Sequence, residues 1–513
     1  MLGYYTIGRE DPHRTALVDP DERTYSFGEL VAASNRYSHG LRALGLGAND
    51  TVALILPNGV ELVEVYGAAI QVGMYTVALN WHLSAPEISY ILENSGARAV
   101  VAHERFGAVA AEAVVGLVDR ERCFAVGGVI DGFRSLQELG AGQPADPPDD
   151  RTAGQATFYT SGTTGRPKGV RKNFGTVAPD EIGLASGIGT VAAAAPADDW
   201  VVLVNGPMYH AAPIAYMATG LDSGATVVLM DRWTPERFLD LVQRYRVNQS
   251  GMVPTMFHRL LSLPDDVREN ADVSSIKYVL TSGAACPPEV KRRMIEWFGP
   301  IINEAYSATE GAGTTVTAQE WLERPGTVGR PSPGVVVRIL DADGNDCPPN
   351  VPGRVFLSQT MWKFEYLGDP DKTSANRIDD MFTVGDIGYL DEDGYLFLCD
   401  RDADIIVRGG VNIYPIEIEG VLLEHPAVAD AVVVGAPNDE WGEEVRAVVE
   451  LKPGVASDSA TVDAITDHCR TRLARYKCPT AVDFVDTMPR DPNGKVRKQP
   501  IRDRYWHGRT RRI

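Results

Sequence analysis

The chain has 513 residues and carries 49 Lys and Arg against 69 Asp and Glu, which gives a formal net charge of −20. Hydrophobic residues make up 44% of it, so the chain can bury large cores, and both a single small domain and general disorder are excluded. A strongly negative protein repels polyanions, and we therefore expect no nucleic acid partner.

The cysteines are scattered and form neither a Cys-x-x-Cys pair nor a zinc-ligand cluster with histidine: Cys123, Cys286, Cys347, Cys399, Cys469 and Cys478. This usage favours a reduced, cytoplasmic location. The N-terminus lacks the basic and then apolar order of a signal peptide. The longest apolar stretch, residues 65–79, is shorter than the roughly 20 residues of a membrane span. Because it also contains Gln71, we interpret it as a buried core helix and expect no integral membrane segment.

Short β-rich segments alternate with longer helix-compatible segments over most of the chain. They lie at residues 51–57, 97–102, 200–204, 225–230 and 277–282. This alternation predicts an α/β fold with substantial parallel sheet. The pattern then changes, and we expect two strands within 394–410, a helix over 414–424, strands at 427–437 and 443–451, and a helix over 458–476. The sequence therefore predicts two domains, residues 1–402 and a compact α+β unit of residues 403–513.

Residues 158–170, FYTSGTTGRPKGV, crowd glycines and hydroxyl side chains around Arg166 and Lys168. Glycines let backbone N–H groups approach an oxyanion, hydroxyls add donors, and Lys168 adds a positive charge, which together suit a nucleotide triphosphate. A Walker A loop requires Ser or Thr directly after its Lys, whereas Gly169 follows Lys168, so an ordinary P-loop NTPase is disfavoured. A plain turn between two strands is the alternative interpretation.

The segment YTSGTTGRPKG resembles the signature loop of the adenylate-forming superfamily, which includes acyl-CoA synthetases, aryl-CoA ligases, luciferases and peptide-synthetase adenylation domains. The likeness is greatest to the acyl-CoA ligases. Further motifs in the family's order are PMYHAAP (207–213), SGAAC (282–286), NEAYSATEG (303–311), VGDIGYLDEDGYL (384–396), DRDADIIVRGGVNIYPIEIE (400–419) and PRDPNGKVRK (489–498). The resemblance implies a large N-terminal region of packed sheets and helices, which binds acyl group and nucleotide, and a small mobile C-terminal domain.

The resemblance also implies which residues contact ATP. The nucleotide-binding residues would be Thr160, Ser161, Gly162, Thr163, Thr164, Lys168, Gly283, Ala284, Ala285, Tyr306, Asp386 and Arg401. Tyr306 would stack on adenine, while Asp386 and Arg401 would meet the ribose, with an interdomain ion pair as the alternative for these two. Thr309 would offer its hydroxyl to the α-phosphate, and Glu310 would be a ligand of Mg²⁺.

The implied chemistry has two steps: a carboxylate attacks ATP to give an acyl-adenylate, and the thiol of coenzyme A then displaces AMP. Lys495 would serve the first step beside the carboxylate and phosphate, and His210 would gate the acyl site. For the second step the C-terminal domain would rotate about Ala403, so that Gly409, Gly410 and Tyr414 line a channel for CoA. A solvated lysine, a core histidine and a simple turn are the structural alternatives.

Two residues depart from the family pattern near the nucleotide, and a third does so at the hinge. Ser307 stands where glycine is usual, Val384 where threonine is usual, and Ala403 where Asp or Lys is usual. Ser307 adds bulk and Val384 removes a hydroxyl beside the phosphate, so adenylation could be weakened. A small residue at the hinge still permits rotation.

The acyl pocket is expected to be lined by residues 209–220 and 251–257, which contain no Lys, Arg, Asp or Glu. The acid is therefore expected to be hydrophobic, whether fatty, aromatic or terpenoid. The leading function is an acid–CoA ligase that uses ATP and Mg²⁺. The alternatives are an adenylating enzyme that passes its acyl group to a carrier protein in trans, an oxidase of the luciferase kind, and a non-catalytic binding protein. A homodimer is left open.

Overall fold

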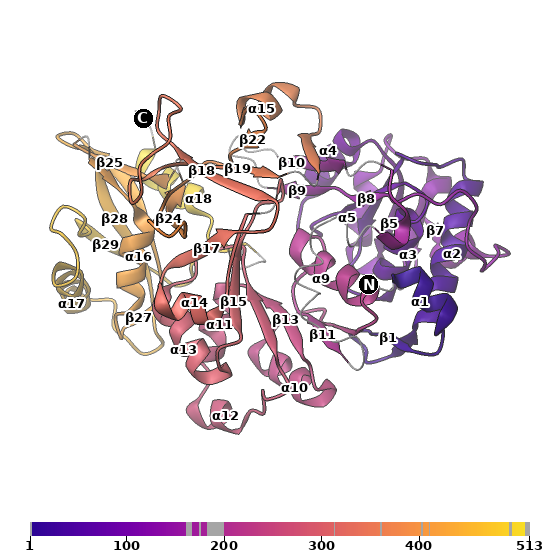
Figure 1. Cartoon of the computed structure of the whole chain (residues 1–513), viewed down its shortest axis with the longest axis horizontal. Helices are drawn as coiled ribbons and strands as arrows, with labels where there is room; N and C mark the ends of the chain where they lie inside the picture. Colours follow the sequence, from indigo (N-terminus) through magenta and orange to yellow (C-terminus); the bar gives the residue numbers. More distant parts are fainter. Residues whose placement is uncertain are drawn as a thin grey trace.

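The computed structural model describes residues 3–160, 167–173, 176–181, 200–311, 313–359, 362–401, 404–409, 411–491 and 495–507. Figure 1 shows the chain running from an N-terminal region (indigo and purple) through a central region (magenta and orange) to a C-terminal unit (yellow) at the opposite end. The order of sheets and helices confirms an α/β fold with a large N-terminal region and a smaller C-terminal unit.

The N-terminal sheet is parallel throughout, in the order β7-β6-β5-β3-β4-β8. Its strands are β3 (Thr51–Ile55), β4 (Tyr75–Ala78), β5 (Ala97–His103), β6 (Cys123–Val126), β7 (Arg134–Ser135) and β8 (Gln155–Ala156). The helices of this region are α1 (Tyr4–Glu10), α2 (Phe27–Ala43), α3 (Val60–Ile70), α4 (Ala85–Ser95), α5 (Gly107–Ala113) and α6 (Leu136–Gly140). Leu54 and Ile55 point to opposite faces and are both fully buried, so both faces of the sheet are covered.

The apolar stretch 65–79 is buried, but the prediction that it forms one core helix is wrong. Helix α3 ends at Ile70, Gly73 turns the chain with φ of 78°, and β4 begins at Tyr75. A Cβ atom at Gly73 would lie only 2.7 Å from Thr152 Cγ2, so the turn requires glycine there. In the described part of the chain, no helix is long and apolar enough to cross a membrane.

The central sheet combines a parallel half with an antiparallel extension. Its parallel strands, in spatial order, are β1 (Thr15–Val18), β12 (Thr226–Leu229), β11 (Val201–Val204), β13 (Gln249–Met252), β14 (Tyr278–Thr281) and β15 (Ile302–Tyr306). Short β2 (Thr24–Ser26) closes one edge. The antiparallel strands are β16 (Thr314–Val316), β17 (Thr327–Pro331), β18 (Val335–Leu340), β19 (Gly353–Gln359), β21 (Arg377–Ile378), β22 (Met381–Phe382), β23 (Asp386–Leu390) and β24 (Leu396–Arg401). The strands predicted at 200–204, 225–230 and 277–282 are thereby confirmed.

The central region also contains seven described helices and a small antiparallel sheet that contacts the N-terminal region. The helices are α9 (Ala211–Asp222), α10 (Pro235–Tyr245), α11 (Pro254–Leu261), α12 (Asp265–Asn270), α13 (Pro288–Phe298), α14 (Ala318–Glu323) and α15 (Pro370–Ala375). The small sheet pairs β9 (Phe158–Thr160), β10 (Lys168–Asn173) and β20 (Lys363–Tyr366). In this pairing Lys168 lies opposite Thr160, so the glycine-rich motif 158–170 begins and ends on two adjacent strands.

The C-terminal unit has its own sheet and core. Its elements are β25 (Ile406–Arg408), β26 (Val411–Ile413), α16 (Pro415–Leu423), β27 (Val428–Asn438), β28 (Gly442–Leu451), α17 (Ser459–Arg470), β29 (Ala481–Val485) and α18 (Lys498–Trp506). Ile406, Ile418 and Val433 belong to one buried cluster of this unit. The predicted strands and the first helix are confirmed, whereas α17 ends at Arg470 instead of residue 476.

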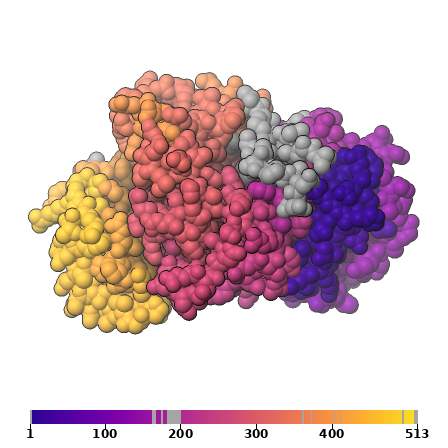
Figure 2. All heavy atoms as spheres, turned by 60° about the horizontal axis from the view of Figure 1, so that its bottom comes forward, coloured from indigo at the N-terminus to yellow at the C-terminus, as the bar shows by residue number. Residues whose placement is uncertain are grey.

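Figure 2 shows the C-terminal unit (yellow) packed against the central region, on the side away from the first residues of the chain (indigo). The chain leaves the central sheet at Arg401, the end of β24, and enters the C-terminal sheet at Ile406. The domain boundary between residues 402 and 403 stays a prediction, since both lie outside the described residues.

Candidate active site

A cleft of about 3540 Å³ is lined by residues of the N-terminal region, the central region and the C-terminal unit. The site residues expected from the sequence that line it are Thr160, Lys168, His210, Gly283, Ala284, Ala285, Tyr306, Thr309, Glu310, Asp386, Arg401 and Lys495. Loops that follow the parallel strands β11, β14 and β15 carry several of them. This position agrees with the rule that ligands of open α/β sheets bind beyond the carboxyl ends of the strands.

Tyr306 and Asp386 are joined in the wall of the cleft. The Tyr306 hydroxyl donates to Asp386 Oδ2 at 2.7 Å. Asp386 lies opposite Arg401 in the β23–β24 pair, and Arg401 Nε is 3.5 Å from Asp386 Oδ1. Burial, followed by the Asp386 charge, raises the pKa of Tyr306 well above its ordinary value, so the phenol stays protonated. A flat ring, an acceptor carboxylate and a cation together can bind a nucleoside.

Glu310 is held at both its backbone and its side chain. It ends a tight turn in which Ala308 and Gly311 exchange N–H···O bonds of 3.0 and 3.1 Å. Its carbonyl oxygen accepts from Trp362 Nε1 at 3.4 Å and its Oε1 from the Tyr366 hydroxyl at 2.7 Å. Only 8% of Glu310 is exposed. Thr309, in the same turn, is half-buried and also lines the cleft.

Two lysines of β10 stand on the aromatic rings that hold Glu310. Lys168 Nζ lies 5.2 Å from the centroid of the Tyr366 ring, and Lys172 Nζ lies 4.8 Å from that of Trp362. Burial lowers the pKa of Lys172 to about 8, opposed by the charge of Glu310. Sequence reasoning missed Lys172, although it shares a strand face with Lys168 by two-residue alternation.

Lys495 reaches the cleft from a loop of the C-terminal unit. Asp491 holds this loop, since Lys495 N–H donates to Asp491 Oδ1 at 2.9 Å and Asp491 N–H donates to Lys495 O at 2.8 Å. Burial lowers the pKa of Lys495, and the Arg401 charge lowers it further. The carboxylates that oppose this shift are Asp491, Asp386 and Asp404. The ammonium therefore lies within electrostatic reach of the ion pair formed by Asp386 and Arg401.

Two ion pairs anchor the loop that carries Lys495. Before it, Arg490 binds Asp430 of β27 through two nitrogens, at 2.6 and 2.7 Å. After it, Lys498 at the start of α18 lies 2.9 Å from Glu419 Oε1 of α16. All four side chains are less than a quarter exposed, so the loop is tied to the body of its unit on both sides.

His210 directly precedes α9, in a loop that a buried asparagine holds. Asn58 Nδ2 donates to the carbonyls of Gly206 and Met230 at 2.9 and 2.8 Å, and Asn58 Oδ1 accepts from Met208 N–H at 2.8 Å. The His210 ring packs 4.4 Å from the ring of Tyr209. Nothing in the sequence pointed to Asn58, which lies far away in the chain and has no motif around it.

The sequence of this chain matches two known family descriptions. Residues 6–363 match the AMP-binding enzyme family, and residues 417–495 match the C-terminal domain of AMP-binding enzymes. This chain belongs to the AMP-binding enzyme family.

Characterised members of the family resemble the chain over nearly its full length. It is 32% identical over 509 residues to the fatty acid–[acyl-carrier-protein] ligase ScoC of Streptomyces coeruleorubidus, which covers 97% of this chain and 95% of the relative. It is 32% identical over 502 residues to the long-chain-fatty-acid–CoA ligase FadD13 of Mycobacterium tuberculosis, with 96% of each chain covered. Feruloyl-CoA synthase of an Amycolatopsis species is also 32% identical over 509 residues, with 98% and 99% covered.

Solved structures agree with this assignment. ATP-bound MatB from Rhodopseudomonas palustris superposes with a TM-score of 0.84 at 28% identity, covering 99% of this chain and 100% of that one. The o-succinylbenzoate CoA synthetase MenE of Bacillus subtilis, in complex with its acyl-adenylate, superposes with a TM-score of 0.81 at 27% identity, covering 100% and 99%. The family membership makes this chain an ATP-dependent acid–thiol ligase that binds ATP.

Two of the residues expected to line a CoA channel in this AMP-binding enzyme, Gly409 and Tyr414, are absent from the described lining of the cleft. Ile416 and Glu417, which follow Tyr414 in the chain, do line it. Gly409 has φ of 58°, donates its N–H to Trp441 O at 2.7 Å, and leaves no room for a Cβ atom, which would lie 2.7 Å from Trp441 Cε3. Trp441 is 46% exposed and Tyr476 is 47% exposed. The exposed indole of Trp441 therefore packs directly against Gly409.

Several expected site residues fall outside the described residues. They are Ser161, Gly162, Thr163 and Thr164 of the glycine-rich loop, together with Ala403 and Gly410.

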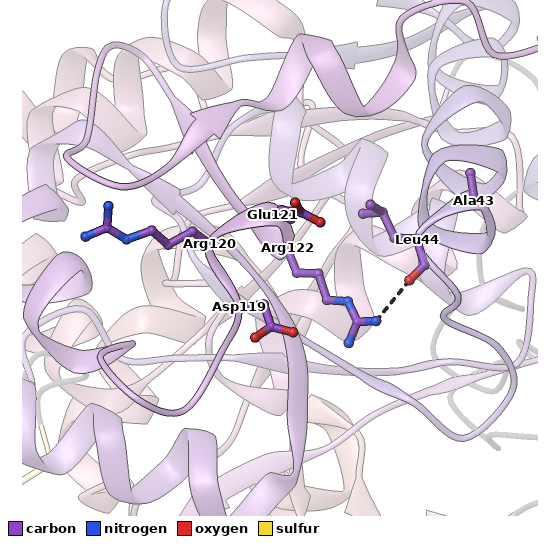
Figure 3. A pocket seen from close by; sticks show the side chains of 6 residues that line it. All are labelled: Ala43, Leu44, Asp119, Arg120, Glu121 and Arg122. Carbon is purple, nitrogen blue, oxygen red and sulfur yellow. Dashed lines mark hydrogen bonds between the residues drawn. The ribbon is translucent and has the colours of Figure 1, made fainter.

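A second, smaller hollow shares no lining residue with this cleft. It has a volume of about 480 Å³ and lies between the end of α2 and the turn before β6 (Figure 3). Its lining includes Leu44, whose carbonyl accepts from Arg122 Nη2 at 3.1 Å, and the charged side chains of Asp119, Arg120 and Glu121. These side chains belong to an exposed, solvated turn, so we assign this hollow no role in the reaction.

Proposed function

We propose that this protein is an acid–CoA ligase that activates a hydrophobic carboxylic acid as an acyl-adenylate and then transfers the acyl group to coenzyme A. The single observation that carries the proposal is the convergence of Lys495, from the C-terminal unit, on the cleft that also contains Tyr306, Glu310 and Asp386. A cation from one unit and a nucleotide-binding wall from the other form one site.

In the first step, the carboxylate oxygen of the acid attacks the α-phosphorus of ATP, the bond to the bridging oxygen breaks, and pyrophosphate leaves. Tyr306 and Asp386 would hold the nucleoside, and Lys495 would bring its positive charge to the meeting anions. All reacting groups are negative, so the residues act by alignment and charge neutralisation, without a covalent bond to the protein.

Glu310 is the proposed Mg²⁺ ligand, and its surroundings fit that role. It is a fixed, hard oxygen donor beside the proposed phosphate site. Among the described residues no group of three or more potential ligand side chains could hold a metal by itself. Mg²⁺ usually takes one or two carboxylates and completes its shell with phosphate and water, which agrees with a single Glu310. When bound there, Mg²⁺ would neutralise charge on the phosphates.

In the second step, the thiolate of CoA would attack the carbonyl carbon of the adenylate and expel AMP. We propose that the C-terminal unit, residues 403–513, rotates about Ala403 relative to residues 1–402, so that the surface around Gly409 replaces Lys495 at the cleft. Exposed Trp441 and Tyr476 on this surface support the proposal, because aromatic faces suit adenine and pantetheine. Arg408, whose Nη1 donates to Tyr476 O at 3.0 Å, adds a cation for the phosphates of CoA.

The acid is proposed to lie against the first turns of α9 and the end of β13. Ala212, Ala215, Tyr216, Gly251 and Met252 line the cleft there, together with His210. Apolar small residues leave space for a hydrophobic body, and methionine adapts to irregular shapes. A reduced, cytoplasmic location is supported by the six cysteines, all of which are free thiols. A homodimer stays a prediction.

An assay with ATP, a panel of fatty, aromatic and alicyclic acids, and two acceptors tests the proposal. Pyrophosphate release and thioester formation are recorded separately, with CoA or a phosphopantetheinyl carrier protein as the thiol. Thioester formation with CoA supports the proposal. Transfer to carrier protein alone would favour the second candidate, which the similarity to a fatty acid–[acyl-carrier-protein] ligase motivates. Pyrophosphate release without transfer to either thiol would contradict both.

A further inference from the structure

Lys172 places a second lysine at the nucleotide side of the cleft, in a defined relation to Glu310. Lys168 and Lys172 lie four residues apart on β10 and therefore share one face of the strand. Each ammonium lies over one aromatic ring, Tyr366 or Trp362. Each of these rings in turn donates a hydrogen bond to Glu310, one to its carboxylate and one to its carbonyl. All five residues line the cleft.

This arrangement balances a buried negative charge. A carboxylate that is 8% exposed is costly unless a positive charge or strong donors offset it, and one phenol donor offsets only part of that cost. The charges of Lys172 and Glu310 interact through the protein interior, where solvent screens little. Uncompensated, Glu310 would also repel the phosphates of an incoming nucleotide.

We propose that Lys172 is a positioning residue of the nucleotide site, which supplies the internal positive charge that balances Glu310 and lets ATP bind before a divalent cation does. The inference rests on the proposed nucleotide role of Glu310 and is independent of the acid and the thiol. Arg171 is a matched control, because it carries the same charge on the opposite strand face. Its guanidinium lies 4.0 Å from the centroid of the Tyr75 ring, away from the cleft.

The test is ATP binding to the full-length protein by titration calorimetry, in EDTA and again in excess Mg²⁺. Lys172→Met is expected to weaken ATP binding in EDTA on the order of 10-fold, because Lys168 alone then offsets the charge of Glu310, which repels the phosphates more strongly. In Mg²⁺ the loss should be much smaller, since the metal takes over the neutralisation of Glu310. Arg171→Met should leave the ratio of the two affinities as in the wild type.

Glu310 provides the reciprocal measurement. The double variant Lys172→Met, Glu310→Gln should regain the wild-type affinity for ATP in EDTA, since no charge is left to balance. Glu310→Gln alone should bind ATP more tightly than the wild type in EDTA, a result that does not depend on Lys172→Met folding correctly. Equal weakening by Lys172→Met in both media, absence of rescue, or unchanged binding by Glu310→Gln would each overturn the inference. A failed ligase assay would leave these binding results intact.

Discussion

The C-terminal unit has two surfaces of different chemistry, and one of them reaches the cleft. The loop around residue 495 places an ammonium beside Arg401 and Asp386, whereas the hairpin of β25 and β26 lies outside the described cleft lining. Both surfaces belong to one unit whose sheet and helices share buried clusters, so they cannot meet the same adenylate in one orientation. In the proposed mechanism this orientation serves acid activation, and thiol transfer would require a second one.

Removal of the ammonium at the cleft gives the largest expected effect. Lys495→Ala should lower pyrophosphate release on the order of 10²–10³-fold, because a fixed charge beside the meeting anions is lost. Thioester formation from supplied acyl-adenylate should change little. The two half-reactions are measured separately by pyrophosphate release and by consumption of the adenylate with CoA.

A surface lysine provides the control for this experiment. Lys277, which is exposed and donates to Ser274 O at 2.9 Å, should tolerate alanine without effect on either half-reaction. Equal losses of both half-reactions in Lys495→Ala would contradict the proposal that one surface serves adenylation and the other serves thioester formation.

The opposite surface should respond in the opposite way. Gly409→Leu should impair thioester formation more than adenylation, on the order of 10-fold, because a side chain at this position collides with Trp441 and disturbs the exposed indole. The positive φ of Gly409 adds backbone strain to any substitution. Trp441→Ala, which removes the indole without strain at residue 409, should show the same selectivity. Thioesterification at the wild-type rate in both variants would remove this surface from the mechanism.

Ser307 and Val384 test whether the adenylation surface is itself impaired. Ser307 is exposed directly after Tyr306, and Val384 is half-buried against an apolar cluster. The preceding Thr383 is buried and lines the cleft, and its hydroxyl oxygen accepts from Gly385 N–H at 3.1 Å. The double variant Ser307→Gly, Val384→Thr should raise pyrophosphate release up to about 10-fold at unchanged thioesterification.

The two single variants separate the two effects. Ser307→Gly tests the added bulk at residue 307, and Val384→Thr tests the missing hydroxyl at residue 384. A wild-type protein that already releases pyrophosphate at least as fast as it consumes added adenylate would contradict the expectation of weakened adenylation. The plain two-step ligase would then stand.

Sequence motifs predicted which residues line the cleft more completely than local hydrophobic patterns predicted the helices and strands. Tyr306, Glu310 and Lys495 can be grouped from the sequence alone, because each sits in a motif whose order is recognisable along the chain. That they line one cleft follows in part from parallel strands ending at the same edge. Asn58 and Lys172 could not be identified as site residues from motifs. Their burial and their contacts arise only when distant segments of the chain pack together.

Local patterns failed where a single residue decided the outcome. The stretch 65–79 is apolar enough for one helix, yet the turn at Gly73 divides it into α3 and β4. The packing of Trp441 against Gly409 shows a related limit, because it joins segments more than thirty residues apart and no local pattern encodes it. The role of Gly409 in a CoA channel stays a prediction.

Glu64 of α3 provides a change that should affect stability while leaving both half-reactions alone. It is outside the described lining of the cleft, and burial followed by the charge of Glu61 raises the pKa of its carboxyl from 4.5 to about 8. A carboxyl whose folded-state pKa is raised stabilises the fold most at low pH, and this contribution is lost as pH rises through about 8. Glu64→Gln mimics the protonated form and removes that dependence. Near pH 5 the variant and the wild type should unfold at the same denaturant concentration. Near pH 9 the free energy of unfolding of the variant should exceed that of the wild type by roughly 2–4 kcal/mol, at ~1.4 kcal/mol per pH unit. Denaturant titrations across this pH range measure the difference.

The activity of the same variant provides the control. The ratio of pyrophosphate release to thioester formation at pH 7 should equal that of the wild type. An altered ratio would mean that the N-terminal sheet influences which surface of the C-terminal unit meets the cleft, and the comparison between the two surfaces would then have to include it.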